Sequence, residues 1–207
     1  MREKSASQPS HLTSRGAATK QRIVEAAAKL IYESGAERVS LDAVMEASRT
    51  SKSQLYHYFA DKDALVREVI ELQTSRVLHF NAAHLDRLDS FQALRKWRDD
   101  ALAANQAGGG IGGCPIGSLA NELAAQSESA RSRLSESFEA WGAIIGSGLA
   151  RMKAQGQIVA SADTDAIAIA VLAAIQGGLL LSKTARNSKP LELAFDMALS
   201  HIERYAA

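Results

Sequence analysis

Apolar residues recur at every third or fourth position along most of the chain, which is the spacing of one buried helix face. The first such run, residues 19–34, is followed by Gly35, and glycine is the residue preferred just after a helix end. No segment shows sustained strand alternation, and proline occurs only at positions 9, 115 and 190. This pattern predicts an all-α protein of about nine helices. The first helix is expected to bury Ile23, Ala26, Ala27, Leu30 and Ile31.

Two short predicted helices, residues 41–48 and 52–59, follow the first and are separated by a short turn. Ser40 and Ser51 are suited to cap them, because a serine hydroxyl accepts hydrogen bonds from the free N–H groups at a helix start. Short helices joined by such a turn have helix-turn-helix geometry.

A long connector helix is predicted from Lys62 to about Leu88, with Asp61 as its cap. At 1.5 Å per residue it is about 40 Å long, enough to leave one domain and enter another. The chain therefore divides into three predicted parts. They are a disordered polar arm at residues 1–14, a three-helix head at 15–62 with its helix-turn-helix motif at 40–59, and a larger helical body at 63–207.

The body contains one strongly apolar run, residues 166–181, which we expect Asp163 to begin as a helix. The run has sixteen residues and includes Gln176 and a glycine pair, whereas a membrane span needs about 20 apolar residues. We therefore favour a buried core or interface helix over a membrane span. The other body helices are predicted at residues 90–107, 117–126, 129–155 and 190–205.

Charge is distributed unevenly along the chain. Residues 1–62 have ten Lys/Arg and seven Asp/Glu, a net +3, and the remainder has a net −2. A basic N-terminal third suggests an anionic partner for that third. The only cysteine, Cys114, cannot form an internal disulfide, which favours a reducing compartment, the cytoplasm.

The segment 51-SKSQLYHYFADKDAL-65 has the strongest functional pattern in the chain. Leu55 and Phe59, four residues apart, can face inward, which leaves a mostly polar outer face. Small polar residues at a helix start suit hydrogen bonds to base edges in a DNA major groove. Tyrosine hydroxyls and lysine ammonium groups suit phosphate oxygens. The alternative is the ordinary solvated face of an amphipathic helix.

Residues 19–70 resemble the DNA-binding head of the tetracycline-repressor (TetR) family of bacterial transcription regulators. The matching stretches are IVEAAAKLIYESG, the Ser40 cap, TSKSQLYHYF and DKDAL. The resemblance implies base-edge contacts from Lys52, Ser53 and Gln54. It implies phosphate contacts from Ser40, Thr50, Tyr56, His57, Tyr58 and Lys62, although His57 is also placed to reach a base.

The chain departs from the family pattern in the turn and in the third helix. Arg49 and Thr50 stand where the family usually has Gly and then Val, and Ser53 stands where it usually has Gly. A positive φ at Arg49 would strain the backbone by about 1–2 kcal/mol. These departures bear on base preference rather than on the fold, because Ser53 is an expected base contact.

The stretch 108-GGGIGGCPIGSL-119 contains a G-x-G-x-x-G match at Gly108, Gly110 and Gly113. A dinucleotide-binding loop needs a strand before it and a helix opening on it, whereas here a predicted helix precedes and Pro115 follows. We interpret the stretch as a helix connection, or more sharply as one edge of a ligand pocket. The run GGCPIGSLANELA is similar to the regulatory domain of the family's LmrA/YxaF-like branch. Cys114 is expected to be a small buried hydrophobe, with a redox sensor as the alternative.

The family resemblance implies a ligand pocket in the body and a dimer formed by the last two helices. An apolar cavity with a few polar groups is typical of a small-molecule site, and an all-round apolar helix needs partners on every side. Candidate pocket residues are Trp97, Cys114, Phe138, Trp141, Ile145 and Gln176. Candidate dimer-interface residues are Ile175, Leu179, Phe195, Leu199 and Ile202. For the pocket, the alternative is that the large apolar residues form plain core.

These features predict a homodimeric, sequence-specific DNA-binding regulator, a repressor released from its operator by a small apolar or aromatic ligand. We expect no enzyme, because the five histidines lack metal-ligand spacing such as H-E-x-x-H and no nucleophile stands at a known spacing from a base. Neither a metal nor a cofactor nor a membrane partner is expected. The alternatives are a helical protein-interaction module and a ligand-independent DNA-binding regulator or activator.

Overall fold

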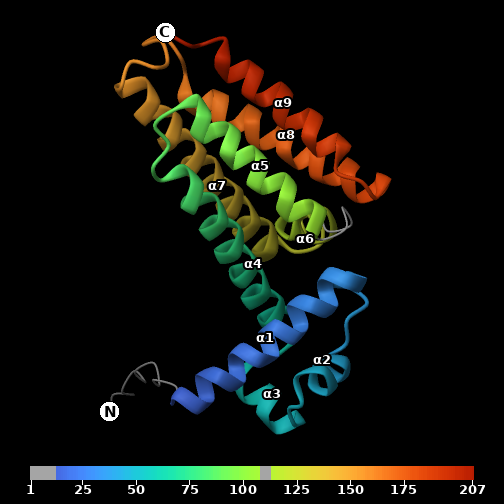
Figure 1. Ribbon diagram of the computed structural model, residues 1–207. Helices are drawn as coiled ribbons and strands as arrows, with labels where there is room; N and C mark the ends of the chain where they lie inside the picture. The colour runs from blue at the N-terminus through green and yellow to red at the C-terminus, as the bar shows by residue number, and fades with distance from the viewer. Residues whose placement is uncertain (1–12, 108–112) are drawn as a thin grey trace, which may run out of the picture. The chain divides into compact units, whose positions relative to one another are not determined.

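The computed structural model describes residues 13–107 and 113–207, and the elements in these ranges are helices (Figure 1). They are α1 (Ser14–Ser34), α2 (Leu41–Ser48), α3 (Lys52–Tyr58), α4 (Lys62–Leu85), α5 (Phe91–Ala107), α6 (Pro115–Leu123), α7 (Glu128–Ala154), α8 (Thr164–Ala185) and α9 (Lys189–Glu203). The strand pairing found in the described ranges is one isolated antiparallel bridge between Ile158 and Ala206. The predicted all-α class is confirmed. Most of the predicted arm, and Gly108 and Gly110 of the G-x-G-x-x-G match, lie outside the described residues.

Helix α1 begins earlier than the sequence pattern predicts. The Thr13 hydroxyl accepts a hydrogen bond from the Gly16 N–H at 3.2 Å, so the helix starts at Ser14. Thr13 and Ser14, which the sequence pattern assigns to the arm, therefore belong to the start of α1. At the other end Gly35 has φ 86°, and its N–H donates to the Ile31 carbonyl at 2.8 Å. The predicted glycine cap is confirmed.

The chain forms two compact units, Met1–Val69 and Ile70–Ala207, and α4 begins in the first and ends in the second. The division falls later than the predicted head boundary at residue 62. The reason is that the first two turns of α4 pack in the head, where Leu65 and Val69 are buried. Lys20 Nζ of α1 also pairs with Glu68 of α4 at 2.7 Å.

The head has its own apolar core. Ile23 of α1, Val44 of α2 and Leu55 of α3 are fully buried in it. Burying one such side chain contributes about 1.5–3 kcal/mol, so these contacts fix the three helices against one another. Arg22 Nε of α1 donates to the Ser48 carbonyl at 2.9 Å, which satisfies a free carbonyl at the end of α2.

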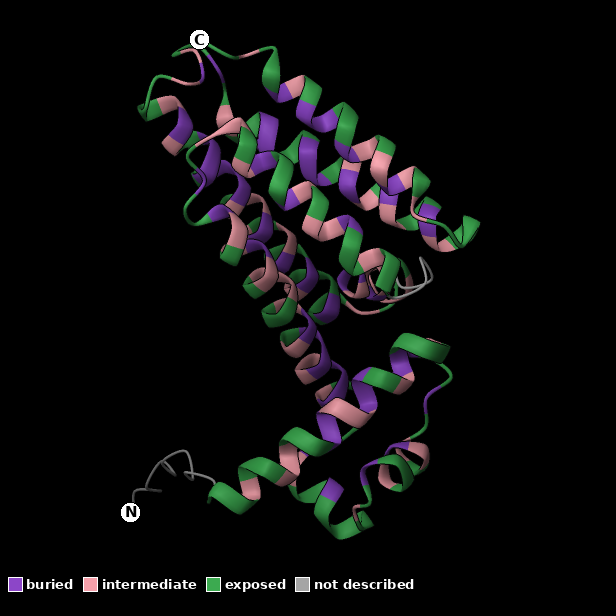
Figure 2. Cartoon of the chain, viewed as in Figure 1, coloured by how far each residue is buried: buried purple, intermediate pink, exposed green. Residues whose placement is uncertain are grey.

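In the body, α8 and α9 pack closely side by side (Figure 2). A Cβ atom on Gly178 would lie 2.8 Å from the Cβ of Ala194, so only glycine permits this spacing. The buried Ser182 hydroxyl of α8 accepts a hydrogen bond from the Leu191 N–H at 3.0 Å. Ser182 thus supplies the cap at the start of α9 that Ser188 does not provide with its own side chain.

Helix α8 is long and apolar enough to cross a membrane by length and composition, with a mean hydropathy of 1.9 over its best 18-residue window. A core helix of a protein without membrane segments passes the same test. Only 33% of that window is buried within the chain. The helix therefore has an apolar face that the described chain leaves uncovered.

Candidate functional site

The turn between α2 and α3 has a left-handed residue, Arg49, with φ 52° and ψ 46°. The N–H groups of Arg49 and Thr50 donate to the carbonyls of Glu46 and Met45 at 3.2 and 3.0 Å. These bonds close the end of α2 in the manner of a left-handed C-cap. Arg49 therefore has the positive φ that strains a non-glycine residue, at a cost of about 1–2 kcal/mol relative to glycine.

Helix α3 begins with a complete capping box. The Ser51 hydroxyl accepts from the Gln54 N–H at 3.3 Å, and Gln54 Oε1 accepts from the Ser51 N–H at 2.9 Å. Each side chain satisfies a backbone donor that the helix start leaves free. The side-chain oxygen of Gln54, an expected base-contacting residue, is therefore already bonded in the cap. The side-chain N–H₂ group of Gln54 takes no part in these capping bonds.

The outer face of α3 is polar and accessible. Lys52, Ser53, Gln54, Tyr56 and His57 are exposed, whereas Leu55 and Phe59 are buried. Tyr56 is 47% exposed and Lys52 Nζ lies 6.0 Å from its ring centroid, so Tyr56 is not a core residue. Tyr58 is half-buried and contacts the His57 ring edge-on, with centroids 4.8 Å apart.

The remaining candidate phosphate contacts stand around this face, and each has a local bond. Ser40 caps α2 by accepting from the Ala43 N–H at 3.1 Å. The Thr50 hydroxyl lies 2.8 Å from that of Ser48. Lys62 Nζ donates to the Glu37 carbonyl at 2.9 Å, which gives a local reason for a cation at the start of α4. An ammonium group has two further N–H donors.

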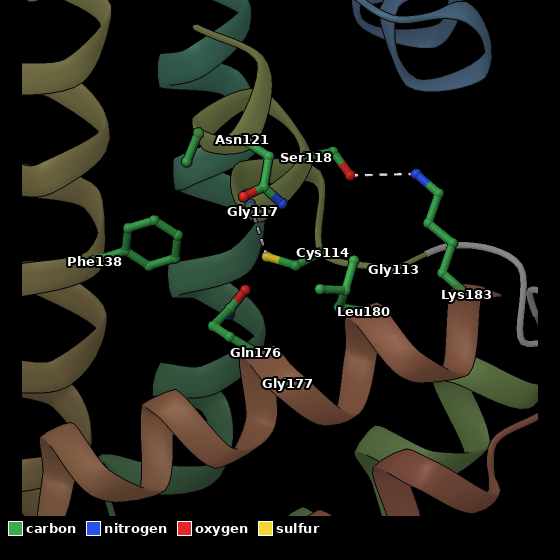
Figure 3. A pocket seen from close by; sticks show the side chains of 11 residues that line it. Gly113, Cys114, Gly117, Ser118, Asn121, Phe138, Gln176, Gly177, Leu180 and Lys183 are labelled. Atoms are coloured by element: carbon green, nitrogen blue, oxygen red, sulfur yellow. Dashed lines mark hydrogen bonds between the residues drawn. The ribbon is translucent and has the colours of Figure 1, made fainter. Parts of the chain in front are cut away.

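A second candidate site is a cavity of about 270 Å³ among α6, α7 and α8 (Figure 3). The described residues that line it are Gly113, Cys114, Gly117, Ser118, Ala120, Asn121, Phe138, Gln176, Gly177, Leu180 and Lys183. All belong to the second compact unit. The cavity has an apolar part and a few polar groups, which is the composition of a small-molecule site.

The segment 113-GCPIG-117 forms one wall of this cavity. Cys114 is the N-cap of α6, with its sulfur accepting from the Gly117 N–H at 3.3 Å, and Pro115 takes the first helical position. A Cβ on Gly113 would lie 3.0 Å from Lys183 Cδ, and one on Gly117 would lie 2.7 Å from Gln176 Oε1. The two glycines therefore make room for two side chains of α8. Helix α6 starts two residues before the predicted position because Cys114 caps it.

Three of the six candidate pocket residues, Cys114, Phe138 and Gln176, line the same cavity. Trp97, Trp141 and Ile145 are buried and are not among the described residues that line this cavity. Trp97 Nε1 instead donates to Asn81 Oδ1 at 3.1 Å. The Trp97 ring packs edge-on against Phe195 at 5.2 Å between centroids, as an ordinary core residue.

Sequence reasoning missed the polar members of the cavity, above all Ser118 and Lys183. Lys183 stands seven residues after Gln176, which is two helical turns, so both lie on one face of α8. This seven-residue spacing is the feature of the sequence that could have identified Lys183 as a cavity residue. Lys183 Nζ donates to the Ser118 hydroxyl at 3.4 Å across the cavity (Figure 3).

The Cys114 thiol is a buried group. Burial raises the pKa of Cys114 above its usual value, while hydrogen bonding to Gly117, Gln176 and Ile116 would favour the thiolate and partly opposes the rise. A thiol of raised pKa is a poor nucleophile at neutral pH, which favours the small-hydrophobe interpretation.

The uncovered apolar face of the body lies on α8 and α9. Four of the five candidate interface residues, Ile175, Phe195, Leu199 and Ile202, are buried within the chain itself, and the prediction is wrong for them. Helix α9 has apolar residues on two faces, and the larger apolar side chains face the core of the same chain. The large apolar side chains of α8 and α9 that are more than half exposed are Ile169, Leu180, Leu181, Leu193 and Met197.

A helix-turn-helix head joined through a long helix to a helical body defines a class of DNA-binding regulators. A family model described as "Bacterial regulatory proteins, tetR family" matches residues 23–69, and one described as "Transcriptional regulator LmrA/YxaF-like, C-terminal domain" matches residues 90–197. The second match covers more than half of the chain. The chain belongs to the TetR family of DNA-binding transcriptional regulators, in its LmrA/YxaF-like branch.

Individual relatives agree with this assignment. An uncharacterised HTH-type transcriptional regulator in the lacX 3′ region of Lactococcus lactis subsp. lactis is 30% identical over 188 residues, covering 90% of this chain and 94% of that protein. The HTH-type transcriptional regulator LmrA of Bacillus subtilis (strain 168) is 28% identical, covering 84% and 90%. The crystal structure of regulatory protein TetR from Rhodobacter sphaeroides has the same fold, with a TM-score of 0.80, 24% identity and coverage of 91% and 99%.

Proposed function

We propose that the protein is a homodimeric repressor that leaves its operator when a small ligand occupies the cavity among α6, α7 and α8. The observation that supports DNA recognition most strongly is the exposed polar face of α3, held by the buried Leu55 and Phe59. Such a helix fits a major groove with its first residues against base edges. The proposed place of action is the cytoplasm, where the DNA is.

On α3, the base contacts are assigned to Lys52, Ser53 and Gln54. Their positions in the first turn suit this role, and the N–H₂ group of Gln54 can donate to a base while its oxygen keeps the cap. Phosphate contacts are assigned to Tyr56 and His57, which are exposed on the same helix, and to Tyr58, Ser40, Thr50 and Lys62 around it. A cation or a hydroxyl at these positions adds affinity for DNA of any sequence, without preference for a base.

The proposed dimer uses the uncovered face of α8 and α9. Five large apolar side chains on these helices are between 53% and 68% exposed, and they are Ile169, Leu180, Leu181, Leu193 and Met197. Leu179, the remaining candidate from the sequence, is half-buried beside them. Burying such a face in a second copy recovers about 25 cal/mol per Å² of apolar surface. Two heads in one dimer can contact two half-sites, which a single head cannot.

Ligand release requires that the ligand prefer the dimer geometry that does not bind DNA. Couplings of about 1–3 kcal/mol are typical of such regulation. The continuous helix α4, which begins in the head unit and ends in the body unit, is the proposed route of coupling. The alternative of a ligand-independent regulator is separated from this proposal in the second stage of the experiment below.

The proposal is tested in two stages with the purified full chain. In the first, genomic DNA fragments retained by the protein are sequenced, and each is used in a gel shift beside a scrambled fragment. A sequence-selective shift supports the regulator, and its absence contradicts it. In the second, compounds that raise the Tm of the protein by mass action are added to the shifted complex. Release of DNA supports ligand control, whereas retention by every stabilising compound favours a ligand-independent regulator.

A further inference from the structure

The charged lining of the cavity is of one sign. Lys183 supplies a cation, Ser118, Asn121 and Gln176 add neutral polar groups, and none of the described lining residues is an aspartate or a glutamate. Phe138 and Leu180 give the cavity apolar surface, and Phe138 lies at the opposite side of the view from Lys183 (Figure 3). A donor-rich end opposite an apolar side is complementary to a ligand with acceptor oxygens at one end.

Gln176 fixes the cavity wall beside Cys114. Its Nε2 is a buried atom, so it does not open onto the cavity. The side chain is held in place by the missing Cβ of Gly117, since a methyl group there would lie 2.7 Å from Gln176 Oε1. Gln176 therefore shapes the wall, and the charge that faces a ligand is that of Lys183.

Lys183 supplies a positive charge without a counter-ion. Its ammonium group has one hydrogen bond in the described structure, a long one of 3.4 Å to the Ser118 hydroxyl, and no ion pair there. Its aliphatic stem lies against Gly113, where a Cβ would approach Lys183 Cδ to 3.0 Å. A cation held at a cavity wall without a carboxylate favours an anionic ligand.

On the premise that this cavity is the proposed effector site, we infer that it selects compact monoanions, namely aromatic or short-chain carboxylates. The carboxylate oxygens accept from Lys183 Nζ, and the apolar part of the ligand packs on Phe138 and Leu180. The cavity of about 270 Å³ lies at the small end of ligand pockets, which restricts the ligand to a compact molecule.

Three probes of equal shape and different charge test this selectivity: benzoate, benzamide and benzylamine. Titration calorimetry of the full chain at constant ionic strength is expected to give benzoate a Kd at least about tenfold below that of benzylamine, the size of one charge-assisted hydrogen bond. Lys183→Met should weaken benzoate about tenfold and leave benzamide unchanged. Lys96→Met, at an exposed lysine of α5 paired with Asp100, is the matched control and should bind as the wild type does.

Equal affinity for the three probes, no binding of benzoate, or an unchanged benzoate Kd in a folded Lys183→Met variant would overturn the inference. Folding of each variant is checked by its helical circular dichroism and by its gel shift. If benzamide binds as tightly as benzoate and releases DNA, ligand control stands and anion selectivity fails. If benzoate binds selectively and DNA stays bound, the anion site stands and release by this class of ligand fails.

Discussion

Gln54 Oε1 accepts a hydrogen bond from the backbone N–H of Ser51 at 2.9 Å, so an expected base-contacting side chain also caps the helix that presents it. Loss of affinity on removing Gln54 would therefore mix two effects, a frayed helix start and a missing base contact. The pair can be separated, because glutamate at this position keeps the capping oxygens and loses the N–H₂ donor.

We predict that Gln54→Ala and Gln54→Glu both change the preferred base at one position of each half-site, by about 1–3 kcal/mol of discrimination. Selection from a randomised operator library measures this preference. Tyr56→Phe, which removes an exposed hydroxyl from the same helix, should weaken all sites alike. A Gln54→Glu protein that selects the wild-type sites would show that Gln54 serves only as a cap.

Arg49→Gly is expected to stabilise the head. Arg49 is left-handed at φ 52°, which costs a non-glycine residue about 1–2 kcal/mol. Glycine removes that strain but gains freedom in the unfolded chain, which offsets about 0.4–1 kcal/mol. The free energy of unfolding in urea should therefore rise by up to about 1.6 kcal/mol. A decrease would show that the Arg49 side chain makes a stabilising contact that outweighs the strain.

The adjacent glycines of α8 give a matched pair. A Cβ on Gly178 would lie 2.8 Å from Ala194 Cβ and 3.0 Å from Leu191 Cα, whereas one on Gly177 would meet nothing within 4 Å. Gly178→Ala should lower the free energy of unfolding by about 1–3 kcal/mol, the usual cost of overpacking. Gly177→Ala should not lower the free energy of unfolding, since alanine is a better helix former than glycine by about 1 kcal/mol. Equal effects of the two substitutions on thermal unfolding would refute the close packing of α8 on α9.

Met197→Glu is expected to convert the dimer to a monomer, because Met197 is 62% exposed and belongs to the uncovered face of α9. Sedimentation velocity measures the change, and Ala103→Glu on an exposed position of α5 is the control that should remain dimeric. Phe195→Ala should act differently, lowering stability by about 3–5 kcal/mol as a core truncation. A Met197→Glu protein that sediments as a dimer would contradict an interface at this face.

Cys114 should be slow to react with alkylating reagents in the folded protein. Burial raises the pKa of its thiol, so the reactive thiolate is scarce at neutral pH. Because the folded protein holds this proton more tightly than the unfolded chain, the associated stability is present below the thiol's unfolded pKa and is lost as pH rises through the folded pKa. Iodoacetamide labelling, followed by mass, should therefore be slower than in urea at pH 7 and should accelerate at alkaline pH. Labelling at neutral pH as fast as in urea would instead support a redox sensor.

The helical architecture could be predicted from the sequence because each helix has both a periodic apolar face and a recognisable end. Gly35, Ser40, Ser51 and Asp163 all act as the predicted caps. The cavity was only partly predictable, because large apolar residues such as Trp97 look alike whether they line a pocket or fill a core. The positions of Lys183 and Gln176 depend on glycines about sixty to seventy residues away in the chain, and periodicity within one helix does not reveal such a contact.

The prediction of the interface residues was wrong at four positions for a related reason. Helix α9 is apolar on two sides, and the packing of α8 and α5 against it decides which side faces inward. Phe195 and Ile202 face the core, and Leu193 and Met197 face outward. A choice of interface residues by size and hydrophobicity alone favours Phe195 and Ile202, which are buried. The residues that a partner can reach are instead Leu193 and Met197.

The central claim is that this chain recognises a specific DNA sequence through α3. The most direct measurement is the ratio of its affinities for a selected genomic fragment and for a scrambled fragment of equal length, taken by fluorescence anisotropy at physiological salt. We predict a ratio of at least about 10³, the lower range for specific DNA-binding proteins, and a steep loss of both affinities with salt. Equal affinities for the two fragments would contradict sequence-specific recognition by this head.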